Sequence, residues 1–135
     1  MFSIDHLGIA VKSLQQAAEF YRRLGLAVVG EETVEQEKVR VAMVPLGESR
    51  IELLEATQAD SPIGKFLAKR GEGLHHVALR VDDLAGTVEQ LKKSGVRLVN
   101  EEIQIGAGGH LYVFVHPSST GGVLLELCEE QPEGA

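Results

Sequence analysis

The order of hydrophobic and polar positions predicts strands and helices in a regular succession. Residues 4–11 are rich in aliphatic side chains, which is typical of a β-strand. Apolar residues then recur at helical spacing over residues 14–24, with Ser13 in place as the N-cap and Gly25 as the C-cap. Three more strands are expected in the first half of the chain, over residues 26–32, 39–46 and 50–56.

The second half of the chain repeats this order after a connector. Within the connector, Ser61 followed by Pro62 predicts the start of a short helix, with serine as the N-cap and proline in the first helical position. A strand over residues 74–81 and a helix over 83–94 come next. The remaining strands are expected at residues 96–103, 111–115 and 123–129, and the tail at 131–135 is expected to be frayed.

The two halves are related in sequence as well as in pattern. Residues 73–84 restate residues 3–14, so that His76 falls on His6 seventy residues later, and a second match places Glu126 on Glu52 at an offset of 74. A repeat of this length cannot bury the apolar faces of its own sheet alone. The predicted fold class is therefore α+β, with two tandem βαβββ modules forming a curled, cup-shaped mixed sheet. We expect one domain over residues 1–135, with module one at about 1–56, the connector at 57–72 and module two at about 73–130.

Composition narrows the class of protein. A formal charge of −7 argues against nucleic acid as a partner, because phosphates require a basic face. Cys128 is the only cysteine, so no intramolecular disulfide is expected and a reducing cytoplasm is the simplest compartment. No signal peptide and no apolar stretch of membrane-spanning length are recognised, so no membrane association is expected.

The histidine and glutamate that the repeat places in each half are the candidates for a functional site. If the axis that relates the modules passes through the cup, two imidazoles and two carboxylates converge on one point. Such a mixed nitrogen and oxygen set suits Co, Ni, Mn, Fe or Zn. From residue types alone a structural role for these histidines stays open, because duplication copies any residue. Against it, carboxylates that face a cup need a cation or must shift their pKa values.

Several stretches of the chain resemble the methylmalonyl-CoA epimerases of the vicinal oxygen chelate superfamily, which also holds glyoxalase I and the extradiol dioxygenases. The stretches that carry the resemblance are IDHLGIAV, FYRRLGL, RIELLEA, SPIGKFLAKRGEGLHHVALRVDDL, GAGGH and HPSSTGGVLLELCE. They cover nearly the whole chain. The superfamily fold is a paired βαβββ module, in agreement with the order of elements expected above.

The resemblance implies a metal-dependent epimerase that interconverts the R and S forms of methylmalonyl-CoA in propionate metabolism, with a homodimer as the expected assembly and an acyl-CoA as the substrate. It places the metal ligands at His6, Glu52, His76 and Glu126, although some members carry glutamine in place of Glu52. Cobalt is the metal most associated with the family; Ni²⁺, Mn²⁺, Zn²⁺ or Fe²⁺ are the alternatives. The resemblance also gives Glu126 an acid/base role, which makes it the candidate catalytic residue.

The second acid/base group is left open by the sequence. Several bacterial members of the family place a glutamate in the third strand, at the position of Arg40 or Val41, and neither residue is a carboxylate. Glu35 and Glu37 lie just upstream, and a shift of at least two residues would be needed to bring them in. Lys38 or a bound water is the other choice.

Two other functions compete with epimerisation: a glyoxalase I-like or other metal-dependent reaction on the same scaffold, and a non-enzymatic module that binds a small molecule. Among the remaining residues, His75 should point away from His76 because side chains alternate along a strand. Cys128 is expected to be a small buried residue. His110 and His116 are expected to be exposed.

Overall fold

The computed structural model describes residues 2–130, except for the side chain of Ala107; the predicted frayed tail lies outside the described residues. The chain divides into two compact units, one of residues 6–75 and one that combines the first five residues with residues 76–135. We call them the N-unit and the C-unit. None of the helices among the described residues is long and apolar enough to cross a membrane.

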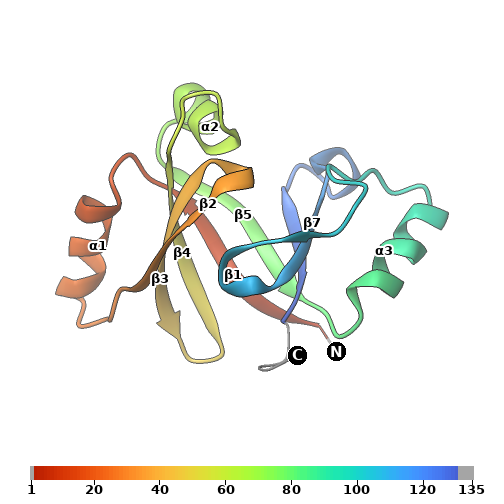
Figure 1. Ribbon diagram of the computed structural model, residues 1–135, viewed down its shortest axis with the longest axis horizontal. Coiled ribbons are helices and arrows are strands. Elements are labelled where there is room, and N and C mark those ends of the chain that lie inside the picture. Colours follow the sequence, from red (N-terminus) through yellow and green to blue (C-terminus); the bar gives the residue numbers. More distant parts are fainter. Residues whose placement is uncertain (1, 131–135) are drawn as a thin grey trace. The chain divides into compact units, whose positions relative to one another are not determined.

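The N-unit is built from strands β1 to β4 and helices α1 and α2 (Figure 1). The strands run in the order β2-β3-β4-β1; β4 is parallel to β1 and antiparallel to β3. Helix α1 packs on one face of this sheet over a buried cluster that includes Leu53, Ala42 and Val44. The bounds are β1 (Ser3–Ala10, whose first residues group with the C-unit), α1 (Leu14–Arg23), β2 (Val29–Val34), β3 (Val39–Leu46), β4 (Ser49–Ala56) and α2 (Pro62–Arg70), with a single 3-10 turn at Glu35–Glu37.

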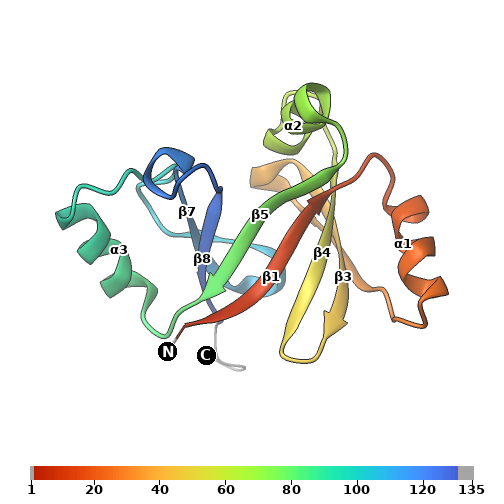
Figure 2. The ribbon, with the colours of Figure 1, turned by 180° about the vertical axis from the view of Figure 1, so that it is seen from behind.

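The C-unit repeats this plan with the order β5-β8-β7-β6 (Figure 2). Helix α3 packs on one face over a cluster that includes Leu84, Val113 and Leu127. The bounds are β5 (Gly73–Arg80, which begins in the N-unit), α3 (Leu84–Lys93), β6 (Gln104–Ile105), β7 (Leu111–Val115) and β8 (Leu125–Glu129). Two further 3-10 turns, at Ala107–Gly109 and Pro117–Ser119, flank β7.

The internal repeat is visible in the hydrogen bonds of both units. The first backbone N–H of α1, at Leu14, donates to the carboxylate of Glu55 at 3.0 Å, and the equivalent N–H at Leu84 donates to Glu129 at 2.9 Å. A carboxylate at this end satisfies a donor that the helix leaves without a partner and complements the helix dipole. Each unit therefore fixes its helix to its sheet by the same long-range contact.

The connector helix begins as predicted. Ser61 is fully buried; its hydroxyl accepts from the N–H of Gly64 at 3.0 Å and donates to the carbonyl of Gln58 at 2.7 Å. Pro62 opens α2, and Gly71, at φ +78°, ends it in a conformation that favours glycine. The same type of N-cap starts α1 at Ser13 and α3 at Asp83.

The predicted strand over residues 96–103 is wrong. Only Leu98 makes a bridge, to Val115, and a strand of two residues, β6, follows later. The Val99 N–H still donates to the Phe114 carbonyl and the His116 N–H to the Arg97 carbonyl, but side chains take the hydrogen bonds next to these two. The Asn100 side chain accepts the N–H of Phe114 at 3.1 Å, and the Arg97 N–H donates to the Ser119 hydroxyl at 2.9 Å.

The βαβββ order in both halves confirms the predicted α+β class with two tandem modules. The strand expected at residues 26–32 begins later, at Val29, and the other predicted strands and helices agree with the observed ones to within about two residues at each end. The assignment of the chain to one domain, with the module boundaries given above, stays a prediction.

Candidate functional site

The N-unit holds a buried pair of His6 and Glu52. In the parallel pairing of β1 with β4, Gly8 lies beside Glu52, so His6, two residues earlier, shares its face of the sheet. The His6 Nδ1 lies 3.4 Å from the Glu52 Oε2, and the two residues are 1% and 5% exposed. We call the face that carries this pair the site face and the face under α1 the helix face.

A residue that the sequence did not single out, Arg50, also contacts this pair. Its guanidinium donates to the Glu52 Oε2 from Nε at 3.0 Å and lies 2.8 Å from it through a second nitrogen. Arg50 and Glu52 are two residues apart on β4, which places both on the site face. The arginine compensates the charge that burial of Glu52 would otherwise leave. The sequence signal that could have identified Arg50 is its position two residues before the candidate ligand Glu52 on the same strand.

The C-unit holds the equivalent pair of His76 and Glu126. Ala78 lies beside Glu126 in the parallel pairing of β5 with β8, the same register as in the N-unit. The His76 Nε2 lies 3.1 Å from the Glu126 Oε1, and both residues are 5% exposed. The structure therefore brings the four predicted residues together two by two, one imidazole and one carboxylate in each unit.

His110 was expected to be exposed, and this expectation is wrong. Its side chain is 12% exposed, and its Nε2 lies 3.5 Å from the second oxygen of Glu126. The available signal was the alternation of His110, Tyr112 and Phe114 along the strand. These residues share a face with Glu126 because Phe114 is the antiparallel partner of Glu126. Glu126 thus has an imidazole at each of its two oxygens.

Aromatic rings fix the position of the His76 imidazole. Phe114 meets it edge to face, with centroids 5.3 Å apart and planes at 90°, and Tyr112 packs edge to face on Phe114 at 5.7 Å. Such contacts favour a defined ring orientation. The imidazole is therefore held by packing on one side and by Glu126 on the other.

The neighbouring residues confirm the strand alternation. His75 packs edge to face against Phe66 of α2, with centroids 5.0 Å apart, and so contacts the connector helix. Cys128 is 2% exposed, as expected of a small buried residue, and packs with Ala78 and Tyr112. His116, also expected to be exposed, is half-buried, and its ring bonds locally to Ser118.

The donor set of each pair fits a metal ion. The ligand atoms of His6 and Glu52, and those of His76 and Glu126, lie within 4.8 Å of one another, as binding to one ion requires. Imidazole nitrogen with carboxylate oxygen is a set that divalent Co, Ni, Mn, Fe and Zn accept. In the C-unit, the Glu126 carboxylate is buried against imidazoles, which carry charge only when protonated. A cation at this carboxylate would offset the cost of burying its charge.

A second buried ion pair of the C-unit has a different character. The Arg80 guanidinium donates to the carboxylate of Asp5 at 2.9 Å, and Asp5 is 4% exposed. The hydrogen bond to Asp5 raises the pKa of Arg80 above its ordinary value. A permanently charged guanidinium of this kind satisfies a buried carboxylate without a metal, so we assign this pair a structural role.

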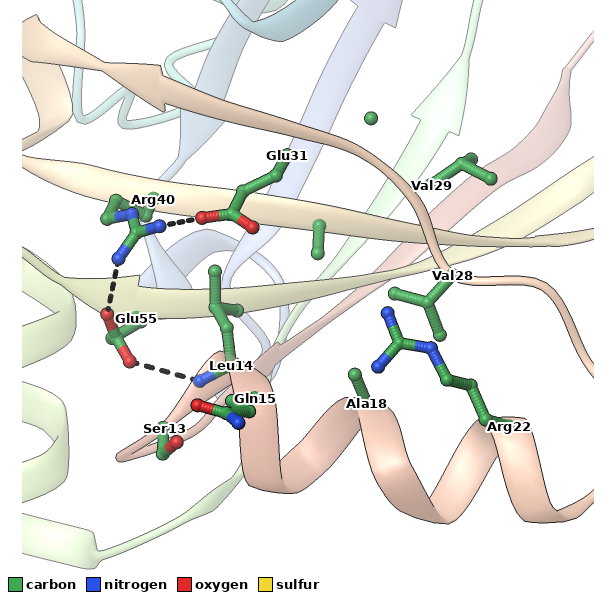
Figure 3. Close-up of a pocket in the computed structure, with 12 residues that line it drawn as sticks. Ser13, Leu14, Gln15, Ala18, Arg22, Val28, Val29, Glu31, Arg40 and Glu55 are labelled. Carbon is green, nitrogen blue, oxygen red and sulfur yellow. Dashed lines mark hydrogen bonds and ion pairs between the residues drawn. The ribbon is translucent and has the colours of Figure 1, made fainter.

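A pocket of about 530 Å³ lies on the helix face of the N-unit, between α1 and strands β2 to β4 (Figure 3). Arg40 reaches across it to Glu31 and to Glu55, whose carboxylate also accepts the N–H of Leu14. Arg40 is the partner of Glu55 across the two strands, whereas Met43 is the partner of Glu52. Arg40 and Met43 are three positions apart on β3, so their side chains point to opposite faces of the sheet. The pocket and the His6–Glu52 pair therefore lie on opposite faces as well.

The comparisons with known proteins place the chain in a family. Residues 5–114 match the model of the Glyoxalase/Bleomycin resistance protein/Dioxygenase superfamily. The match spans well over half of the chain, and the paired βαβββ order is consistent with it. The chain belongs to this superfamily.

Its relatives narrow the family further. The mitochondrial methylmalonyl-CoA epimerase of Homo sapiens is 41% identical over 126 residues, covering 92% of this chain and 72% of the human protein. The solved structure of methylmalonyl-CoA epimerase from Mycobacterium tuberculosis matches with a TM-score of 0.92 at 39% identity, covering 96% of this chain and 89% of that one. A methylmalonyl-CoA epimerase in complex with methylmalonyl-CoA and NH₄⁺ matches with a TM-score of 0.90 at 40% identity, covering 94% and 93%. Within the superfamily, the chain belongs with the methylmalonyl-CoA epimerases.

Proposed function

We propose that the protein epimerises methylmalonyl-CoA, interconverting the R and S forms by removing and returning the proton on the α-carbon. The observation that carries this proposal is the match, over 94% of the chain, to an epimerase solved with methylmalonyl-CoA itself. The buried His–Glu pair in each unit supports it, because a reaction that forms an enolate needs acid/base groups and positive charge held in place.

We further propose that His6, Glu52, His76 and Glu126 are the ligands of one divalent ion, with Co²⁺ as the first choice. The internal repeat supports this assignment, because it gives both units the same imidazole and carboxylate in the same register. When bound, the ion would act as a Lewis acid that stabilises the negative charge arising on the thioester oxygen. The chain's own contribution is to hold the four side chains buried and oriented.

Glu126 is the proposed acid/base residue. As a carboxylate it takes the α-proton while the C–H electron pair moves into the enolate; as a carboxylic acid it returns a proton to that carbon. His110 and His76, at its two oxygens, fix the orientation of the carboxyl group. At 5% exposure its carboxyl group has little contact with bulk water.

The proposal is tested by deuterium wash-in at the α-carbon of methylmalonyl-CoA in D₂O, together with elemental analysis of the purified protein. We expect exchange and racemisation, loss of both after treatment with a chelator, and recovery on addition of Co²⁺. A hemithioacetal of the glyoxalase I type is the control substrate and should not be converted. Full activity in protein shown to be metal-free would contradict the metal assignment, and conversion of the control substrate alone would contradict the epimerase.

We also propose that the protein acts in the cytoplasm as a homodimer, in propionate metabolism, and that its 135 residues form one domain. The sequence has one cysteine, Cys128, and it is buried, which supports a reducing compartment. The family resemblance supports the dimer, which light scattering of the purified protein tests directly.

A further inference from the structure

The N-unit pair has a partner that the internal repeat does not copy. Both units carry the same imidazole and carboxylate, but the position two residues before Glu126 holds Leu124, whereas the position two residues before Glu52 holds Arg50. We propose that Arg50 is a positioning residue that restricts Glu52 to binding the divalent ion through one oxygen, Oε1. This inference rests on the proposed function, in which Glu52 is a metal ligand.

The contacts of the Glu52 carboxylate are concentrated on one of its two oxygens. The Arg50 Nε donates to Oε2 at 3.0 Å, a second guanidinium nitrogen lies 2.8 Å from the same oxygen, and the His6 Nδ1 lies 3.4 Å from it. Each carboxylate oxygen has about two lone-pair sites, so the two guanidinium nitrogens take those of Oε2. Among the described residues, no hydrogen bond or ion pair goes to Oε1. Oε1 is therefore the oxygen that is open to a metal ion.

The strand register makes Arg50 the side chain that orients this carboxylate. In the pairing of β1 with β4, Arg50 lies beside His6 and Glu52 lies beside Gly8. On the other side, the antiparallel partner of Glu52 is Met43 on β3. Glycine has no side chain and the methionine thioether donates no hydrogen bond, so neither direct partner of Glu52 competes with the arginine.

Burial and permanent charge keep this contact in place. The side chains of Arg50 and Glu52 are 19% and 6% exposed, so few water molecules can replace either partner. Hydrogen bonds between ionised groups are about twice as strong as those between neutral ones. A guanidinium also stays protonated at any pH at which the protein is folded, so the contact does not depend on pH. Arg50 therefore holds Oε2 while an ion binds at Oε1.

The number of oxygens that Glu52 gives to the ion decides how much of the ion is left for the substrate. A carboxylate that binds through one oxygen takes one position on the ion, and a carboxylate that binds through both takes two. Partners that orient a metal ligand without touching the metal matter for this reason. By occupying Oε2, Arg50 keeps one position available for an oxygen of the proposed substrate.

The test is Arg50→Met, which keeps the length of the side chain but removes every N–H donor. The proteins are loaded with Co²⁺, their metal content is measured by elemental analysis, and X-ray absorption of the cobalt distinguishes one-oxygen from two-oxygen carboxylate binding. We expect Glu52 to bind through both oxygens in the variant, and kcat/KM to fall by about 10–100-fold. The matched control is Arg40→Met, which removes an arginine paired with Glu55 on the helix face and should leave the cobalt spectrum unchanged.

A second variant decides the question even if Arg50→Met does not fold. The amide of Glu52→Gln has a single oxygen, so this variant should show the same number of cobalt ligand atoms as the wild type. Adding Arg50→Met to it should then change nothing further, and the double variant leaves no unpaired buried carboxylate.

Two results would overturn the role of Arg50. One is an identical cobalt spectrum in wild type and Arg50→Met at equal metal content, and the other is a loss of one ligand atom in Glu52→Gln alone. Wild-type protein that binds no Co²⁺, or that does not epimerise methylmalonyl-CoA, would instead contradict the proposed function itself.

Discussion

Replacement of Glu126 by glutamine tests the proposed proton transfer separately from the proposed metal binding, at a carboxylate that contacts two imidazoles. Glutamine has the same shape and keeps an oxygen that can ligate, but it cannot accept or deliver a proton at neutral pH. Both imidazole contacts, at 3.1 Å from His76 and 3.5 Å from His110, can still be made to the amide. The expected result is protein that folds and binds metal but hardly turns over.

The magnitude follows from the burial of this residue. A general acid/base group is worth about 10²–10⁴ in rate, and at 5% exposure no bulk water can replace it, so we expect about 10³–10⁴. This corresponds to roughly 4–5.5 kcal/mol of the activation barrier. The turnover number is measured with both epimers at saturating substrate and metal.

The control for this experiment lies three residues along the same strand. Glu129 faces α3, where it accepts the N–H of Leu84, so Glu129→Gln should cost about 1 kcal/mol or less of stability and leave turnover unchanged. Wild-type turnover in Glu126→Gln would remove Glu126 from its catalytic role. An equal loss of turnover in both variants would show that the strand tolerates no change. It would refute the argument that Glu126 and Glu129 act on opposite faces of the sheet.

Two further pairs of substitutions, each a test with its control, probe the site and the fold. His76→Ala should lose metal by elemental analysis, whereas His75→Ala should keep it because His75 packs against Phe66 of α2; the reverse outcome would overturn the strand register. Ser61→Ala should lower the free energy of unfolding by about 1–2 kcal/mol in urea titrations, because it removes a buried N-cap and the partner of the Gln58 carbonyl. Ser94→Ala, at an exposed hydroxyl, should change it by less than about 0.5 kcal/mol.

The sequence by itself determined the elements and the candidate ligands. Hydrophobic spacing and caps such as Ser61 are local signals, so they predicted the helices correctly. The internal repeat marked His6, Glu52, His76 and Glu126, because duplication shows in the order of residues. The strand at 96–103 failed because its pattern of apolar residues does not reveal that Asn100 uses its side chain for the bond to Phe114.

The tertiary structure decided which residues face each other across strands. Register is a long-range property, set when β2, β3 and β4 pair, and a slip of one residue would turn every side chain to the other face. That is why the contacts of Arg50 with Glu52 and of His110 with Glu126 could not be read from spacing along the chain. The sequence marked the four candidate ligands, and only the pairing of the strands decided their neighbours.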